Sequence, residues 1–213
     1  SINYRVGIFG FLAHPELSSE APYGASGNYA LLDMIAGLKW VKENIASFGG
    51  DPNQITIAGQ SAGAFAVNFL CASPLAKGLF QGAIAESGAS MLPSPLRPAI
   101  SKAQAEANGV EFATKLGAKS LSDLRAMSAE AIQKAGGNAS PYTDGYVLPL
   151  AMPEIYAKGL QNDVPILVGW NSEDRLSMKA AEPEVFKATL DKRFGVRGQE
   201  LLNFYGPSGS LAL

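Results

Sequence analysis

This sequence has a single cysteine, no basic tract and no long apolar run. Its only cysteine is Cys71, which excludes a disulfide bond within the chain and leaves the redox compartment undetermined. Lysine and arginine number 17 against 19 acidic residues, a formal net charge of −2 without a basic tract, so nucleic acid and anionic membranes are disfavoured as partners. No apolar run reaches the roughly 18 residues that a transmembrane helix needs, and we expect no membrane span.

What remains is an ordinary globular composition. The 213 residues are 47% hydrophobic and 17% charged, which disfavours disorder and coiled coil and gives room for one sizeable core, or one domain with a small appendage. The chain begins inside a strand-like run without an initial methionine and ends in a loop, so we expect the central piece of a longer protein. Secreted, periplasmic and cytoplasmic locations therefore all stay open.

The most informative stretch is Ile55–Gly63, where a short β-branched run leads into Gly59-Gln60-Ser61-Ala62-Gly63 and a helix-compatible run follows. A G-x-S-x-G pattern between a strand and a helix is typical of the tight turn that exposes a nucleophilic serine. Gly59 and Gly63 would remove β-carbons that clash where the chain passes the strained turn. Ser61 is the candidate nucleophile, and the amide of Ala62 is placed to meet an oxyanion.

A plain strand-to-helix turn is the simpler interpretation of the same five residues. A dinucleotide site or a P-loop fits less well, because neither G-x-G-x-x-G nor a pattern ending in Lys-Ser/Thr is present around Ser61.

The order of elements predicts an α/β fold. We expect strands at 4–9, 55–58, 82–86 and 164–168, helices at 28–46, 62–71, 101–116, 120–135, 182–194 and 199–205, and a loop at 14–25. Alternating strands and helices favour a mostly parallel sheet with helices on both faces. We divide the chain into a core at 1–92, a helical excursion at 93–140 and a return to the core at 141–213. The excursion is interpreted as a cap over the pocket, with a second small helical domain as the alternative.

Serine hydrolysis also needs a base and an acid that orients it. Glu173 and Asp174 follow the strand at 164–168, where side chains project over the same sheet edge as Ser61, although a solvated loop would have the same spacing. The only histidine, His14, precedes the serine and sits beside a proline, so we interpret it as structural. A base and a second source of oxyanion donors are thus missing, and these residues alone are predicted not to be a competent hydrolase.

Several further motifs occur in order along the chain. They are Asn3-Tyr4-Arg5-Val6-Gly7, Gly10-Phe11-Leu12, Gly27-Asn28, Phe48-Gly49-Gly50-Asp51-Pro52, Gly78-Leu79-Phe80, Ser87-Gly88 and Asp144-Gly145-Tyr146-Val147-Leu148-Pro149. With the serine pentapeptide, this set resembles the type-B carboxylesterases, the cholinesterase-like branch of the α/β-hydrolase fold. The resemblance implies a partial α/β-hydrolase that cleaves small-molecule carboxylic esters through an acyl-serine intermediate and a Ser-Asp/Glu-His triad.

The resemblance also assigns roles to residues. It implies Ser61 as nucleophile, Ala62 as oxyanion donor and Asp174 as the acid, with Glu173 as the alternative because Arg175 replaces the usual glycine. Ser87 matches a serine that supports the acid, and the glycines at 59 and 63 support the turn. The histidine is expected outside the chain, and neither a metal nor a cofactor is expected; the oligomeric state stays open.

Two other functions remain as alternatives. A non-catalytic cholinesterase-like adhesion module would tend to lose the serine, which argues for the enzyme because Ser61 is present. Amide or carbamate hydrolysis uses the same acyl-enzyme logic and cannot be separated by sequence. The strands at 4–9 and 164–168 are predicted to be buried on both faces, as in parallel sheets. With their neighbours expected outside the chain, we predict exposed edges and association of the isolated chain.

Overall fold

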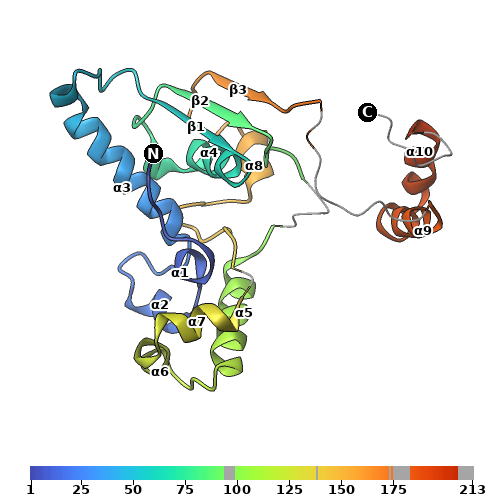
Figure 1. Cartoon of the computed structure of the whole chain (residues 1–213), viewed down its shortest axis with the longest axis horizontal. Coiled ribbons are helices and arrows are strands. Elements are labelled where there is room, and N and C mark those ends of the chain that lie inside the picture. Colours follow the sequence, from blue (N-terminus) through green and yellow to red (C-terminus); the bar gives the residue numbers. More distant parts are fainter. Residues whose placement is uncertain (94–98, 138, 173, 175–182, 206–213) are drawn as a thin grey trace. The chain divides into compact units, whose positions relative to one another are not determined.

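The computed structural model describes residues 1–93, 99–137, 139–172, 174 and 183–205. By its contacts the chain forms two compact units, Ser1–Gly169 and Trp170–Leu213. The first unit contains the whole sheet, and the second contains a pair of helices (Figure 1). The predicted boundaries at 93 and 140 both fall inside the first unit and stay a prediction.

A parallel sheet is the centre of the first unit. Its strands are β1 Thr56–Gln60, β2 Gly82–Glu86 and β3 Ile166–Gly169, in the order β1-β2-β3. Gln60 pairs with Glu86, and Glu86 pairs with Gly169, so the three carboxyl ends lie at one edge of the sheet. The α/β fold class is confirmed, and three of the four predicted strands are present with ends shifted by a few residues.

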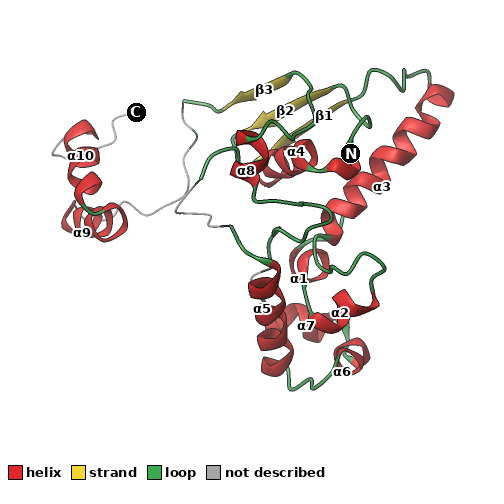
Figure 2. Ribbon diagram, turned by 180° about the vertical axis from the view of Figure 1, so that it is seen from behind, coloured by secondary structure: helices red, strands yellow, loops and turns green. Residues whose placement is uncertain are grey.

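Helices cover one face of this sheet. Those around it are α3 Tyr29–Asn44, α4 Ala62–Ala72 and α8 Met152–Ala157, with the short 3-10 turns η1 Ile45–Phe48 and η2 Pro74–Ala76. Figure 2 places α4 and α8 on the same side of the strands. The buried core joins them through residues such as Leu31 and Leu38 of α3, Val67 and Leu70 of α4, and Ile155 of α8.

The opposite face of the sheet is open among the described residues. Ile57 of β1 is buried, whereas its neighbours Thr56 and Ala58 are exposed. Every residue of β3 is exposed, and Leu167 keeps 66% of its accessible surface. The predicted exposed edge is therefore confirmed for β3, which pairs only with β2 among the described residues, whereas burial of this strand on both faces is not seen in this chain.

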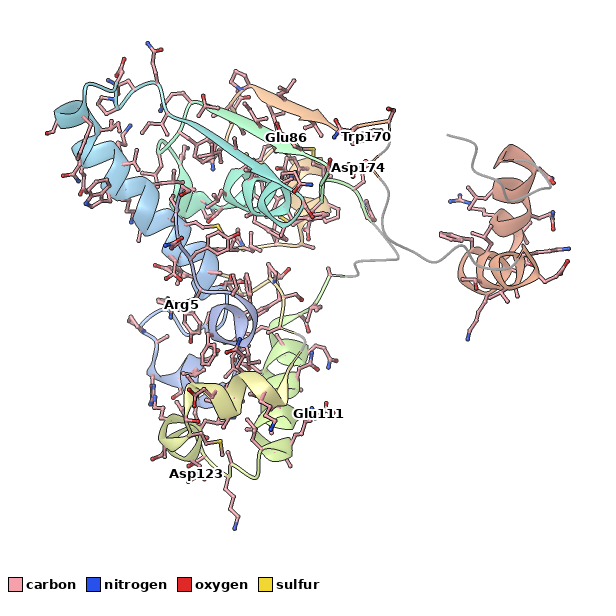
Figure 3. All side chains as sticks on the ribbon, in the orientation of Figure 1. Arg5, Glu86, Glu111, Asp123, Trp170 and Asp174 are labelled. Carbon is pink, nitrogen blue, oxygen red and sulfur yellow. The ribbon has the colours of Figure 1, made fainter. Side chains whose placement is uncertain are left out.

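The predicted strand at 4–9 is not formed. Residues 1–6 have no regular structure, and the short helix α1 Gly7–Phe11 follows after a left-handed turn at Gly7, whose φ is 56°. Arg5 explains the difference (Figure 3). Its backbone N–H donates to the Asp33 carboxylate of α3 at 3.0 Å, and its guanidinium bonds the same group at 2.8 and 2.7 Å. This segment is thus tied to a helix and not to a neighbouring strand.

Residues 14–25, predicted as a loop, contain the helix α2 Pro15–Glu20. His14 caps its start, with Nδ1 accepting the N–H of Glu16 at 3.2 Å, and Pro15 occupies the first helical position, where no amide donor is needed. The loop was predicted from Pro15, Pro22 and Gly24, but Pro15 stands at the first helical position, where a helix accepts proline.

Across the described residues of the helical excursion, three helices are present where two were predicted. They are α5 Lys102–Lys115, α6 Leu121–Ala126 and α7 Ala129–Ala135. The second predicted helix divides at Ser128, whose hydroxyl accepts the N–H of Ala131 at 3.2 Å and begins α7. The excursion packs beside α2, since Arg125 pairs with Glu20 at 2.6 Å and the Leu121 N–H donates to Glu16 at 3.2 Å.

The second unit contains α9 Pro183–Phe194 and α10 Val196–Tyr205. Gly195 joins them in a left-handed conformation with φ of 54°. A β-carbon at Gly198 would lie 2.8 Å from the Leu190 carbonyl, so the two helices approach closely there. The prediction for 182–194 is confirmed, and α10 begins earlier than the predicted helix at 199–205.

Candidate active site

Ser61 sits in a strained turn between β1 and α4. Its backbone has φ of 52° and ψ of −114°, a conformation that costs a non-glycine residue about 1–3 kcal/mol. The surrounding backbone holds it there: the Ser61 N–H donates to the Glu86 carbonyl at 2.9 Å, and its own carbonyl accepts the Phe65 N–H at 3.1 Å. The side chain is exposed at the carboxyl edge of the sheet. This is the geometry expected of a nucleophile at a strand-to-helix turn.

The two glycines of the pentapeptide have different roles. A β-carbon at Gly59 would lie 2.4 Å from the carbonyl carbon and oxygen of Gly63, closer than any real contact. A β-carbon at Gly63 would meet nothing within 4 Å. The expectation that both glycines remove a clashing β-carbon is thus correct for Gly59 and wrong for Gly63, whose backbone is itself what approaches Gly59.

The chain after β2 packs against the serine turn. Ser87 has a φ of 56°, and its N–H donates to the Gly169 carbonyl at 2.7 Å, which links the ends of β2 and β3. A β-carbon on Gly88 would lie 2.9 Å from the backbone carbonyl oxygen of Ser61 and 2.9 Å from the Ala64 β-carbon. Ser87 and Gly88 therefore connect the ends of the strands to the turn through their backbone.

Asn68 of α4 is a residue that sequence reasoning missed. It is fully buried, and its Nδ2 donates to the Ala64 carbonyl at 2.6 Å and to the Gly88 carbonyl at 3.3 Å. Its Oδ1 has no hydrogen-bond partner within the described part of the chain. The available signal was an amide side chain inside the otherwise apolar helix Ala62–Ala72. Asn68 joins the helix that carries the serine to the segment that packs against it.

A cavity of about 1170 Å³ opens beside the turn, within the first unit. It begins at Ala62 and follows α4 past Phe65 and Phe69. Leu148 and Met152 contribute to its wall, and most of the lining is apolar. The arrangement places a concave apolar surface next to the residue whose amide is the predicted oxyanion donor, which is typical of a small-molecule site.

Asp174, one of the two predicted acids, lies in the second unit, after β3 ends at Gly169. The Asp174 N–H donates to the Asn171 carbonyl at 3.0 Å, in a turn. Glu173 lies outside the described residues. The assignment of either carboxylate as the orienting acid stays a prediction.

His14 is structural in this chain, as the sequence indicated. It is 6% exposed, its Nδ1 is used as the cap of α2, and its backbone N–H donates to the Ser26 hydroxyl at 3.0 Å. Cys71 offers no alternative nucleophile, because burial raises the pKa of its thiol to about 11 and keeps it protonated near neutral pH.

Within the described ranges, no group of three or more His, Cys, Asp or Glu side chains is arranged to hold a metal ion. The helices of the same part of the chain are all too short or too polar to cross a membrane.

Comparisons with known proteins agree with the fold. The model of the carboxylesterase family matches residues 1–201. The chain is 40% identical over 209 residues to fumonisin B1 esterase of Sphingopyxis macrogoltabida, covering 92% of this chain and 37% of that protein. It is 38% identical over 207 residues to para-nitrobenzyl esterase of Bacillus subtilis (strain 168), covering 90% and 40%.

Solved structures give the same result. A structure of PNB esterase, 33% identical, matches 97% of this chain and 46% of its own with a TM-score of 0.74. The carboxylesterase EST55 of Geobacillus stearothermophilus, 34% identical, matches 96% of this chain and 44% of its own with a TM-score of 0.69. This chain thus spans less than half the length of these relatives. It has an α/β-hydrolase fold, and it belongs to the carboxylesterase family.

Proposed function

We propose that the full-length protein hydrolyses carboxylic esters through an acyl-serine intermediate on Ser61. The observation that carries this proposal is the strained Ser61 backbone at the β1–α4 turn, held by the Glu86 carbonyl and closely approached by Gly88. Backbone strain of this kind persists only where the surrounding structure imposes it, and it clusters at functional sites. Family membership supports ester hydrolysis in general.

The chemistry follows from the start of α4. The Ser61 hydroxyl attacks the ester carbonyl carbon, and the carbonyl oxygen gains negative charge in the tetrahedral intermediate. Ala62 is the first residue of α4, so its N–H has no acceptor within the helix and lies at the positive end of the helix dipole. We assign that N–H as one oxyanion donor. Loss of the alcohol leaves an acyl-serine, which water hydrolyses.

The proton acceptor is assigned outside these residues. His14 is the single histidine of the sequence, and its Nδ1 and its burial belong to the structure of α2. We therefore assign the base to a histidine elsewhere in the full-length protein and its orienting acid to Asp174, with Glu173 as the alternative. The carboxylate would fix the imidazole tautomer and stabilise the imidazolium as it forms.

The test is Ser61→Ala in the full-length protein, with Ser47→Ala as the control, since Ser47 is an exposed serine of η1 that does not line the cavity. Covalent labelling by a fluorophosphonate and turnover of p-nitrophenyl acetate are expected to disappear in Ser61→Ala and to persist in Ser47→Ala. Full labelling of Ser61→Ala would contradict the assignment. Turnover of p-nitroacetanilide without turnover of the ester would show an amidase in place of an esterase.

A further inference from the structure

Asn28 stands at the start of α3 but gives its side chain to a distant segment. An asparagine in this position usually caps the helix, its side chain accepting an N–H of the first turn. Here the backbone carbonyl of Asn28 accepts the N–H groups of Leu31 and Leu32, whereas the side chain makes no capping bond to the helix. Its backbone is left-handed with φ of 48°, which asparagine tolerates better than most residues. The side chain is therefore available to another partner.

That partner is Tyr142, 114 residues further along the chain. The Nδ2 of Asn28 donates to the Tyr142 carbonyl at 2.9 Å, and its Oδ1 accepts the Tyr142 N–H at 3.3 Å. Asn28 is 0% exposed and Tyr142 is 3% exposed, so both bonds lie away from water. The amide side chain thus pairs with both backbone groups of one residue. A carboxylate of the same size could make only one of these bonds, since it has no hydrogen to donate.

The side chain of Tyr142 is held by the two residues that precede Asn28. Its hydroxyl donates to the Ser26 carbonyl, and a β-carbon at Gly27 would lie 2.8 Å from its ring. Gly27 has a φ of 68°, so glycine supplies both the backbone conformation and the room for the ring. Ser26 is anchored in turn, because its hydroxyl accepts the His14 N–H at 3.0 Å. Every polar group of Tyr142 therefore has a partner within this short segment.

Tyr142 belongs to the wall of the cavity beside the serine turn. Its neighbour Thr143 also lines this cavity, and the Thr143 N–H donates at 3.1 Å to the carbonyl of Ile100, a third lining residue. Ile100 precedes α5 and Tyr142 follows α7, so the bonds to Asn28 connect this part of the wall to the start of α3. A displacement of Tyr142 would change the shape of the cavity that begins at Ala62.

We propose that Asn28 is a positioning residue, which holds the Tyr142 part of the cavity wall in the place where a bound substrate contacts it. Asn28 is not among the described residues that line the cavity, so it acts through Tyr142. The inference rests on the proposed esterase function, because the cavity begins at the assigned oxyanion donor Ala62. A positioning role predicts weaker binding with an unchanged chemical step. A residue that only stabilises the fold would instead lower the amount of active protein and leave its affinity unchanged.

Fluorophosphonate labelling of the full-length protein is the first test, because it separates reversible binding from the covalent step on Ser61. In Asn28→Asp, we expect the inhibition constant of the reversible step, KI, to rise about tenfold and the maximal labelling rate to change by less than about twofold. Asn108→Asp is the control, because Asn108 is exposed and its Oδ1 accepts the Gln104 Nε2 at 2.8 Å, a role that a carboxylate keeps. An unchanged KI in Asn28→Asp, or a lower labelling rate alone, would overturn the inference.

Binding without chemistry distinguishes a failure of this inference from a failure of the proposed function. p-Nitroacetophenone has the shape of p-nitrophenyl acetate without its ester bond, and calorimetry measures its Kd in the full-length Ser61→Ala protein. At about pH 8, we expect Asn28→Asp in this background to raise the Kd about tenfold. At about pH 5 the ratio should fall towards one, because burial raises the pKa of a carboxyl group and its protonated form regains a donor for the Tyr142 carbonyl.

Each outcome of the binding experiment is decisive. A ratio near one at about pH 8, or a ratio that does not fall at about pH 5, would overturn the inference. Ester turnover that persisted in Ser61→Ala would contradict the proposed function without altering this ratio. If Asn28→Asp does not fold, Asn28→Gly takes its place, because glycine adopts the left-handed backbone without cost and removes both bonds to Tyr142. The same rise in Kd is expected, and a folded Asn28→Gly protein with an unchanged Kd would overturn the inference.

Discussion

At the scale of single residues, the serine turn depends on the space of one methyl group. Gly59→Ala would place a β-carbon 2.4 Å from the Gly63 backbone, whereas Gly63→Ala meets nothing within 4 Å. We expect Gly59→Ala to lower the free energy of unfolding by about 1–3 kcal/mol and to slow fluorophosphonate labelling of Ser61. Gly63→Ala is the matched control, with a smaller effect on both. Urea unfolding and labelling rates measure this, and equal damage by the two variants would contradict it.

Single substitutions can also identify the acid that orients the base. In the full-length protein, Asp174→Asn keeps the shape of the side chain but removes the negative charge that would stabilise an imidazolium. We expect kcat for p-nitrophenyl acetate to fall by several orders of magnitude in Asp174→Asn and by less in Glu173→Gln. The reverse ranking would assign the acid to Glu173.

The same scale shows what sequence could predict and what it could not. The strained backbone of Ser61 and the lack of space at Gly59 were predictable because both depend on neighbours in the chain. Gly63 was misjudged because the pattern does not show which of the two glycines lacks room for a β-carbon. The contacts of Gly88 and Asn68 were missed for another reason: they join segments far apart in sequence. The Nδ2 of Asn68, for example, reaches a carbonyl 20 residues away. A short local pattern carries no information about such a partner.

At the scale of elements, Asn68 connects α4 to the segment that follows β2. Asn68→Ala would remove the buried donor of the Ala64 carbonyl and the partly buried donor of the Gly88 carbonyl, at a cost of about 1–3 kcal/mol in the free energy of unfolding. Asn44→Ala is the control, because its Nδ2 makes the same bond to a carbonyl four residues back, Trp40, on the exposed side of α3. We expect only Asn68→Ala to slow labelling of Ser61. Equal labelling rates in the two variants would show that Asn68 has no influence on the serine.

The elements themselves were predictable where periodicity and caps agree. The helix at 62–71, the helix at 101–116 and the strand at 82–86 are confirmed with small shifts. The strand at 4–9 was wrong because its strand-like composition does not reveal that Arg5 binds Asp33 of α3. The helix α8 was missed because it is a single short segment held by the core through Met152 and Ile155.

At the scale of the whole molecule, we expect the exposed edge strand β3 to determine whether the chain associates with other copies. Leu167 on β3 is 66% exposed, and Val168 beside it is 40% exposed. An exposed apolar edge strand favours pairing with another chain. We expect the 213-residue chain by itself to associate at micromolar concentration, as measured by sedimentation velocity, and to show no turnover of p-nitrophenyl acetate.

One substitution distinguishes association through the β3 edge from non-specific association through any exposed apolar side chain. Leu167→Lys places a charge on β3, whereas Leu160→Lys makes the same change at a position that is 60% exposed outside the sheet. Association is expected to weaken in Leu167→Lys alone. A soluble monomer with turnover that Ser61→Ala abolishes would instead show that another group in this chain serves as base.

The hydrogen bond from the Ser61 amide to the Glu86 carbonyl has a consequence for the order of folding. A positive φ at serine is unfavourable in an unfolded chain. The hydrogen bond that holds this conformation closes the loop from residue 61 to residue 86. Because this bond continues the β1–β2 register, we expect the loop to close together with strand pairing, which is slower than formation of α4 alone. We therefore expect the strained conformation of Ser61 to form late in folding. During synthesis or refolding, a serine-directed label would report completed strand pairing, not mere helix formation.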